Sequence, residues 1–536
     1  MAKSFSRPAA GAVALSTVAL LVGVPAGASA KTQGFRPGSL AVAATTYPTE
    51  KPDLTVGQPI PTWNPAGQGS SNGIAVADGT YPYAFNNDGP DGSFAVSSAV
   101  NLLDVNNGGH LLDRYDVPTS EQTTSFSSKS ELALNLSTDG QDLTWSGYNA
   151  APGALDASNS NTPYVYDATN PDIASMPNSP SGTPGYFRRV GDYNVANSKF
   201  SYTDTNDYSG DNGRAALLDN AADEIFMAGN SNNGSTSTAQ PLVNVTGAQS
   251  VTPGQPADTV PSKPLASFST QQIGATKVDK PGKDTNFRGL TEFNGVVYYT
   301  KGSGSNGVNT VYFIDTTGNA CPNGTGLPAP GAPLPTQTGA TYKMCILKGF
   351  NTGLASAETK QFPFGLWFAN KDTLYVADEG DGGTTYDPTT NTWADAAPSS
   401  PGGSDAGLQK WVFDGTQWNL AYTIQNGLNL GQPYSSPVKG YPTGNNSGNG
   451  GTNLPWNPAN DGLRNISGHV NSDGSATIYA TTSTVSGSGD PGADPNSVVA
   501  VTDKLASTTA GTDRFRTVEA PRSGFRYGGV AWLPNK

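Results

Sequence analysis

The sequence predicts an all-β fold, a single β-propeller of about six blades, and three observations point to it. Past residue 30, no long segment has the apolar spacing of an amphipathic helix. Short alternating apolar segments lie instead between turns of the DG, NG and GSG kinds, as in antiparallel sheets. One pattern of these segments recurs along the chain, which indicates a four-stranded unit repeated around an axis.

The repeat is a short apolar strand, a polar turn, a second apolar strand that ends in small polar residues, and two further strands. Its first strands begin near residues 131, 214, 288, 364, 464 and 526. The last of them, RYGGVAWLP (526–534), has no strand after it, whereas the segment 38–118 lacks a first strand. We therefore expect the C-terminal strand to be the innermost strand of the first blade and to close the ring.

Two other architectures stay open at this point. Seven blades result if the poorly patterned segment 425–460 contains one more. Two β-sandwich domains would also use short alternating strands with frequent turns.

The N-terminus has the pattern of a secretory signal peptide. Lys3 and Arg7 precede an apolar segment, which ends at the small residues Ala28-Ser29-Ala30. We expect residues 1–30 to be removed, leaving 31–536 as one propeller domain that is secreted, extracellular and monomeric, with no membrane span. This removal moves the formal net charge from −13 to −15. So acidic a chain is a poor partner for nucleic acid or for an anionic membrane.

The two cysteines of the chain, Cys321 and Cys345, fall in one loop-like segment. In an oxidising compartment this predicts one local disulfide. A catalytic cysteine is the weaker interpretation, because His110 and His469 are the only histidines that could activate it. The scarcity of histidine also argues against zinc or copper sites and against a Ser-His-Asp triad.

Several segments together resemble a known family. They are GSLAVAA, LALNLSTDG, SGDNGRAAL, NFRGLTEFNGVVYYTKGSG, GLWFANKDTLYVADEGDGG, GLQKWVFDGTQW and GGVAWLP. Along almost the whole mature chain, this sequence is similar to an uncharacterised family of secreted bacterial β-propeller-like proteins. The resemblance implies the fold and an extracellular location, and it implies no activity and no site residue.

Alignment of the first strands places four arginines in one column, which are Arg214, Arg288, Arg464 and Arg526. First strands line the channel of a propeller, so we expect a partial ring of arginines at one mouth of the channel. Guanidinium groups bind carboxylate or phosphate in a bidentate manner, which predicts a ligand-binding site for anions. The alternative is structural, because Asp211, Asp284 and Asp461 each precede an arginine and would form ion pairs with it.

Acidic residues follow the second strand of two repeats and form the candidate metal site. They are Asp378, Glu379 and Asp381 in one loop and Asp490 and Asp494 in another. Carboxylates on glycine-rich loops suit Ca²⁺, whereas the alternative is a solvated acidic loop. The same carboxylates would also serve as the acid and base of a glycosidase-type reaction.

Aromatic residues on long loops complete the candidate ligand-binding set. Tyr434 and Trp456, with Tyr441 and Trp393, lie on loops expected at the same face as the arginines. Such rings stack on sugars, or else they fix their own loop.

These features predict a secreted propeller that binds an extracellular carbohydrate or anionic polymer on its long-loop face. Two alternatives stay open. One is an extracellular hydrolase or lyase acting on polysaccharide or phosphate ester, and the other is a structural or cell-surface interaction protein. No catalytic residue is assigned, and Ca²⁺ is the one cofactor considered.

Overall fold

The computed structural model describes most of the chain after the predicted signal peptide. The described residues are 34–47, 95–155, 157–163, 185–231, 246–257, 264–280, 282–337, 341–357, 361–383, 385–393, 406–447, 452–488 and 492–535. In these ranges the structure is all-β, with one 3-10 turn, η4 (Thr270–Ile273), as its helical element. No helix in this part of the chain has the length and apolar content needed to cross a membrane.

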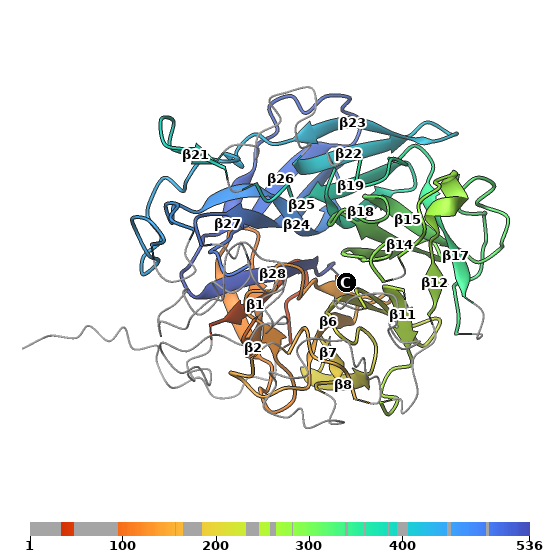
Figure 1. Ribbon diagram of the computed structural model, residues 1–536, viewed down its shortest axis with the longest axis horizontal. Helices are drawn as coiled ribbons and strands as arrows, with labels where there is room; N and C mark the ends of the chain where they lie inside the picture. Colours follow the sequence, from red (N-terminus) through yellow and green to blue (C-terminus); the bar gives the residue numbers. More distant parts are fainter. Residues whose placement is uncertain are drawn as a thin grey trace, which may run out of the picture.

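Four sheets each contain a path of four antiparallel strands, and they are arranged around a common centre like the blades of a propeller (Figure 1). The first path is β28 (Phe525–Trp532), β1 (Leu40–Thr46), β2 (Ser97–Val105) and β3 (Leu111–Asp116), and β4 (Thr124–Ser125) also pairs with β2. The second is β5 (Asn135–Leu136), β6 (Asp142–Tyr148), β7 (Arg188–Asn194) and β8 (Lys199–Thr205). The third is β18 (Pro363–Asn370), β19 (Thr373–Asp378), β22 (Gly407–Phe413) and β23 (Trp418–Ile424). The fourth is β24 (Ala459–Val470), β25 (Ser475–Val485), β26 (Val498–Lys504) and β27 (Arg516–Glu519).

The remaining large sheet has nine strands. One part of it is β9 (Gly213–Asp219), β10 (Glu224–Gly229), β11 (Ala248–Val251) and β12 (Ala266–Ser267). The other is β13 (Leu290–Phe293), β14 (Val296–Lys301), β15 (Thr310–Asp315) and β17 (Tyr342–Leu347), with β16 (Thr325–Gly326) beside β17. The two parts are joined by a short parallel pairing of β12 with β17.

The predicted hairpins form because their turn residues accept positive φ. Between β13 and β14, Asn294 and Gly295 have φ of 53° and 78°, which suits the tight turn of a two-residue hairpin. The alternating strands then bury their apolar side chains between neighbouring sheets, where the main core clusters lie. A further hairpin, β20 (Tyr386–Asp387) with β21 (Thr392–Trp393), stands outside these sheets.

The innermost strands contact one another in a closed cycle, in the order β5, β9, β13, β18, β24, β28 and back to β5. Glycines allow this close approach. A Cβ on Gly289 would lie 1.9 Å from the carbonyl oxygen of Phe364, and one on Gly529 would lie 2.3 Å from that of Leu132. The inner strands of neighbouring sheets therefore approach each other backbone to backbone at these positions.

The C-terminal strand closes the ring, as the sequence predicts. β28 pairs antiparallel with β1 over the whole length of β1, from Leu40 opposite Trp532 to Thr46 opposite Phe525. The propeller-like arrangement is therefore confirmed, with four four-stranded sheets and one nine-stranded sheet. Residues 425–447 and 452–458 contribute no strand, so they do not supply the extra blade considered above.

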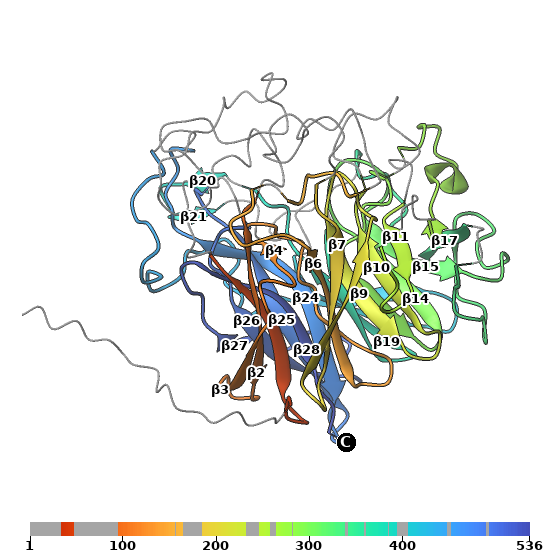
Figure 2. The same ribbon diagram turned by 90° about the horizontal axis from the view of Figure 1, so that it is seen from below.

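The two ends of the ring axis differ. In Figure 2 the C-terminus lies at one end, and the hairpin β20–β21 lies toward the other. The innermost strand β24 begins after the long segment 425–458 and ends at the short turn 471–474. The first residues of the inner strands therefore lie toward the long-loop end. Residues 1–30 are outside the described ranges, so the signal peptide stays a prediction.

Candidate functional site

The four predicted arginines all lie at or near the starts of inner strands. Arg214 is in β9, Arg288 lies two residues before β13, Arg464 is in β24 and Arg526 is in β28. All four are buried, with at most 6% of each residue exposed. Burial, followed by the charge of Arg214, lowers the pKa of Arg288 to about 9; Arg464 acts in the same direction, and Glu379 and Asp211 oppose it. Arg214 and Arg464 are thus both within electrostatic reach of Arg288.

Arg526 and Arg214 are held by protein acceptors. The Arg526 guanidinium donates to the carbonyl oxygen of Phe126 at 2.8 Å. Arg214 lies 3.6 Å from Asp211 and donates to the carbonyl oxygen of Phe287 at 3.1 Å and to the side chain of Asn286. Its Nε has no hydrogen-bond partner among the described residues. The ion-pair alternative is therefore realised for Arg214.

Arg464 pairs with a different carboxylate from the one its sequence neighbours suggest. Its Nε donates to Glu379 at 3.3 Å, and both side chains are buried. Asp461 instead accepts a hydrogen bond from the backbone of Gly382 at 3.0 Å. Glu379 comes from the end of β19 in the neighbouring sheet, so this pair ties two sheets together.

Arg288 has no carboxylate partner among the described residues. Its Nε donates to Ser303 Oγ at 3.0 Å, and Nη2 donates to the same oxygen. Asp284, the predicted partner, accepts instead from the backbone of Lys280 at 2.6 Å. The predicted Asp284–Arg288 pair is therefore absent in this part of the chain.

A second cation lies beside Arg288. Lys301 is fully buried at the end of β14, and its Nζ donates to Ser303 O at 2.7 Å and to Asn309 Oδ1 at 3.0 Å. Burial, followed by the charge of Arg288, lowers the pKa of Lys301 to about 7. Two cationic side chains thus converge on Ser303. The sequence signal for Lys301 is a lysine that ends the apolar strand VVYYTK, which our sequence interpretation did not use.

Two of the inner positions carry other residues. Phe364 is buried, and Glu131 is buried among donors. Glu131 accepts from Tyr148 OH at 2.5 Å, from Ser125 N at 2.9 Å and from Thr124 Oγ1 at 2.8 Å. These bonds assign Glu131 to holding the loop around β4.

Asp461 and Glu379 form a carboxylate pair with opposite pKa shifts. Burial, followed by the charge of Asp381, raises the pKa of Asp461 to about 8. Burial also acts to raise the pKa of Glu379, but the charges of Lys129, Arg464 and Arg288 outweigh it and the pKa is lowered. The Asp461 carboxyl lies against the backbone of Gly380, directly after Glu379. The pKa values of the two acids are thus shifted in opposite directions.

The predicted metal ligands do not form a common ligand set in the described structure. Asp378 accepts from the backbones of Phe362 and Gly380 at 2.8 and 3.0 Å, Glu379 pairs with Arg464, and Asp381 accepts from Gly383 N at 2.7 Å. Asp494 is on another loop, where it accepts from Tyr441 OH at 2.5 Å and from Ser486 at 2.9 Å. Asp490 lies outside the described residues.

One geometric cluster of metal-binding residue types does occur in the described ranges. It consists of Asp315, Cys321 and Cys345. The two cysteines form the predicted disulfide, so they are not thiolate ligands. The disulfide prediction is confirmed.

The predicted aromatic ligand-binding residues hold loops in place. Trp456 is 1% exposed, and its ring meets that of Tyr441 edge to face at 5.9 Å. The hydroxyl of Tyr434 donates to Asn460 and to the carbonyl oxygen of Pro495, each at 3.1 Å. Trp393 donates to the carbonyl oxygen of Asn457 at 2.7 Å. The loop-fixing alternative fits Trp456 because its ring is covered.

The channel has a cavity of about 400 Å³ at its other end, lined by residues of all the inner strands. Trp367, Trp532, His469 and Glu292 are among these residues. His469 stacks on Trp532 with ring centroids 3.9 Å apart. The sequence interpretation did not identify the residues that line this cavity. The same alignment of first strands, continued to the ends of the strands, would have placed them together.

Comparisons with known proteins give distant matches. No family model matches the chain, and no curated protein matches it. A periplasmic gluconolactonase from Pseudomonas aeruginosa is 10% identical, covers 90% of this chain and 83% of its own, and has a TM-score of 0.32. A polysaccharide lyase, an ulvan lyase bound to a sulfated disaccharide unit, is 10% identical over 75% of each chain, with a TM-score of 0.28. AztD from Citrobacter koseri is 8% identical, covers 83% of this chain and 98% of its own, and has a TM-score of 0.22. Likenesses this low carry no argument about function, so the family resemblance stays a prediction.

Proposed function

We propose that this protein binds an anionic ligand in its channel, at the layer of Arg214, Arg288 and Arg464. The observation that carries the proposal is Arg288, a buried guanidinium whose described hydrogen bonds go to a serine hydroxyl. Glu379 and Asp211 act on Arg288 only from a distance, and no described carboxylate contacts its guanidinium. Burying a charge without a direct partner costs on the order of several kcal/mol. An anion bound there would remove much of this cost.

The neighbouring groups set the chemistry of the ligand. Lys301 lies on the same serine as Arg288, and Arg214 has an Nε without a partner. A carboxylate, sulfate or phosphate group would accept from two guanidinium nitrogens at once. Because the arginines are buried, we propose a small anion or the acidic end of a sugar chain. The internal segment of a long polymer does not suit a layer this enclosed.

The setting of this activity is also proposed. The signal-peptide pattern and the disulfide Cys321–Cys345 support export of the protein to an oxidising compartment. We propose six blades, with the nine-stranded sheet counted as two, β9–β12 and β13–β15 with β17. The cycle of innermost strands supports this count, and the arginine layer then lies on the axis of a monomer.

Thermal unfolding with added anions tests the proposal. Galacturonate, phosphate and sulfate would be compared with chloride at equal ionic strength. A ligand that binds the folded state raises Tm. At a ligand concentration about a hundredfold above Kd, the free energy of unfolding rises by about 2.7 kcal/mol. We expect one of the anions to raise the Tm of the wild-type protein and to have no effect on Arg288→Ala. Arg114→Ala, which removes an exposed arginine of β3, is the matched control and should keep the full rise.

Stability separates a ligand role from a structural one. Arg464→Ala leaves Glu379 buried and unpaired, so we expect a loss of about 3–5 kcal/mol in the free energy of unfolding. Arg288→Ala breaks no ion pair and should be no less stable than the wild type. Chemical denaturation of both variants measures this. Equal Tm rises in Arg288→Ala and the wild type, or a loss of stability in Arg288→Ala as large as in Arg464→Ala, would refute the site.

A second candidate is a hydrolase or lyase acting on the same anionic ligand. The pair of Asp461 and Glu379 favours it, because acid and base roles require neighbouring carboxyl groups with separated pKa values. Both lie beside Arg464, which would hold the ligand. Turnover of an acidic oligosaccharide or phosphate ester that stops in Asp461→Asn, while the anion-dependent Tm rise persists, would support the enzyme. Anion binding without any turnover would limit the protein to binding.

A further inference from the structure

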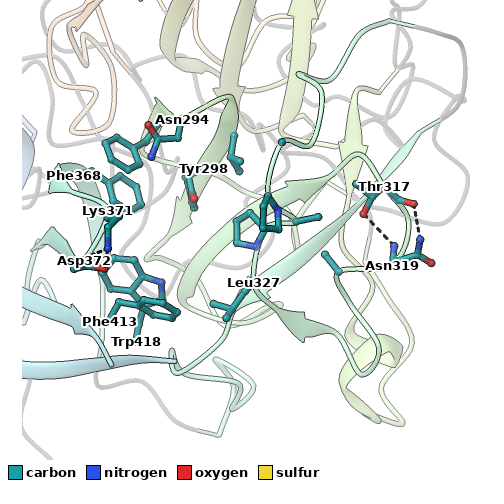
Figure 3. A pocket seen from close by; sticks show the side chains of 17 residues that line it. Asn294, Tyr298, Thr317, Asn319, Leu327, Phe368, Lys371, Asp372, Phe413 and Trp418 are labelled. Atoms are coloured by element: carbon teal, nitrogen blue, oxygen red, sulfur yellow. Dashed lines mark hydrogen bonds and ion pairs between the residues drawn. The ribbon is translucent and has the colours of Figure 1, made fainter. Parts of the chain in front are cut away.

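A large apolar pocket lies away from the channel, between the nine-stranded sheet and the sheet of β18 and β19. It has a volume of about 870 Å³, within the usual size range of small-molecule sites. Its lining comes from the hairpin β13–β14, the turn between β18 and β19, the strands β22 and β23, and the loop 317–331 (Figure 3). Neither the arginine layer nor the channel cavity shares a residue with it.

One wall of the pocket is a continuous set of aromatic rings. Phe293 stacks on Phe368 with centroids 4.5 Å apart and an interplanar angle of 9°. Phe368 meets Trp418 edge to face at 5.8 Å, and Trp418 lies 5.5 Å from Phe413. Tyr298 adds a further ring at 4.7 Å from Phe368. These side chains come from two sheets, so the packing between the sheets fixes the wall.

The opposite wall is a loop that is fixed at several points. Leu327, Pro328, Ala329 and Pro330 line the pocket from this side. The disulfide from Cys321 to Cys345 ties the loop to β17, and β16 pairs with the same strand. The carboxylate of Asp315, at the end of β15, accepts from the backbones of Thr317, Gly318 and Ala320 at 2.8–2.9 Å. The pocket is thus built before any ligand arrives.

The rim of the pocket carries little net charge. Lys371 and Asp372 lie 2.7 Å apart and offset each other. Asn294 stands near them, and Thr317 and Asn319 lie at the other side of the pocket (Figure 3). Aromatic walls with neutral polar groups at the edges suit an apolar molecule with rings, and they disfavour an anion.

We propose that this pocket binds an uncharged, ring-containing small molecule, with its rings against Phe368 and Trp418 and its polar groups at the rim. The aromatic wall supplies the apolar contact area, and the disulfide-anchored loop supplies a preformed second wall. Preorganisation of this kind reduces the entropy lost on binding.

Binding of N-phenyl-1-naphthylamine, a neutral aromatic probe that fluoresces in apolar surroundings, tests the proposal. The wild-type protein should bind it saturably, with one probe per chain. Leu327→Asp places a charge on the half-buried loop wall and should weaken binding by about tenfold or more, because the probe would desolvate that carboxylate. Leu111→Asp, at a leucine of β3 that is 53% exposed, is the matched control and should bind like the wild type.

Two further measurements keep the test decisive. If Leu327→Asp does not fold, Ala329→Trp takes its place, because it fills the pocket without adding charge. Replacement of both Cys321 and Cys345 by Ser should weaken probe binding while the melting of the sheets remains cooperative. Equal affinity in Leu327→Asp or Ala329→Trp and in Leu111→Asp would overturn the proposal, as would the absence of saturable binding in the wild type.

Discussion

Several charged side chains are buried at the inner strands of this protein. Arg464 and Glu379 neutralise each other across two sheets, whereas Arg288 and Lys301 share one serine. Asp461 lies close to Arg464 and Glu379, and one of its carboxyl oxygens has no hydrogen-bond donor in the described part of the chain. The protonation of these buried groups changes with pH, so we expect the free energy of unfolding to change with pH as well.

Asp461 predicts a specific dependence of stability on pH. Its pKa is about 8 in the folded protein and 3.8 is its ordinary value, so between these pH values the folded state holds a proton that the unfolded chain has released. The free energy of unfolding contributed by Asp461 is therefore fully present below about pH 4 and falls as pH rises toward 8. Asp461→Asn removes this titration, so the variant should gain stability relative to the wild type across that window.

Chemical denaturation at several pH values between 4 and 8 measures the difference between the two proteins. Asp113→Asn, at an exposed aspartate of β3, serves as the control. A difference that stays constant with pH would show that Asp461 is ionised in the folded state.

Sequence alone places the arginines and finds the Asp211 partner of Arg214, but it does not find the partner of Arg464. Arg214, Arg288, Arg464 and Arg526 align because equivalent positions of a repeat stand at similar heights along the axis. The partner of Arg464 is 85 residues away in the neighbouring sheet, so a search among nearby aspartates finds the wrong one. Likewise, the covering of Trp456 depends on Tyr441 and on loop packing that no local pattern encodes.

At the scale of the strands, glycines in the inner ring allow neighbouring sheets to meet. Gly289 directly precedes β13, where its Cα faces the backbone of Phe364. A Cβ on Gly365 would likewise lie 2.6 Å from the carbonyl oxygen of Arg464. These positions have no room for a Cβ, because the opposing atoms are backbone and cannot rotate away.

We expect Gly289→Ala to lower the free energy of unfolding by about 3 kcal/mol, since overpacking against backbone forces the strands apart. Gly108→Ala is the matched control, because Gly108 is exposed and the nearest atoms to a Cβ there belong to side chains, with Asn106 Oδ1 at 3.2 Å and the His110 ring at 3.5 Å. Urea denaturation of both variants gives the comparison. A loss no larger in Gly289→Ala than in Gly108→Ala would mean that the inner strands separate easily.

Alternation and turn chemistry predict the strands well, because both are local properties. The pairing of β12 with β17 was not predictable in this way. The pairing is parallel and involves only two residues of each strand, so the sequence of neither strand indicates its partner.

For the whole molecule, β28 completes the first sheet and also contacts β24 and β5 of its neighbours. A chain truncated after Gly524 lacks this strand. We expect it to lose cooperative unfolding, because β1 then presents an unpaired edge and the cycle of inner strands is open. Removal of Lys536 alone should leave the transition unchanged. Calorimetry of the two truncated chains tests this. A cooperative transition in the chain that ends at Gly524 would show that the ring does not need its C-terminal strand.

The pairing of β28 with β1 also has a consequence for biosynthesis. Thr45 and Arg526 lie opposite each other, so nearly five hundred residues separate the two sides of the closure. Ribosomes add roughly 5–20 residues per second, so β1 emerges on the order of half a minute or more before its partner. Throughout that interval the edge of β1 that β28 later covers is unpaired in the nascent chain, where it is able to pair with a strand of another chain. The nascent protein therefore depends on being kept apart from its neighbours until its last strand is made.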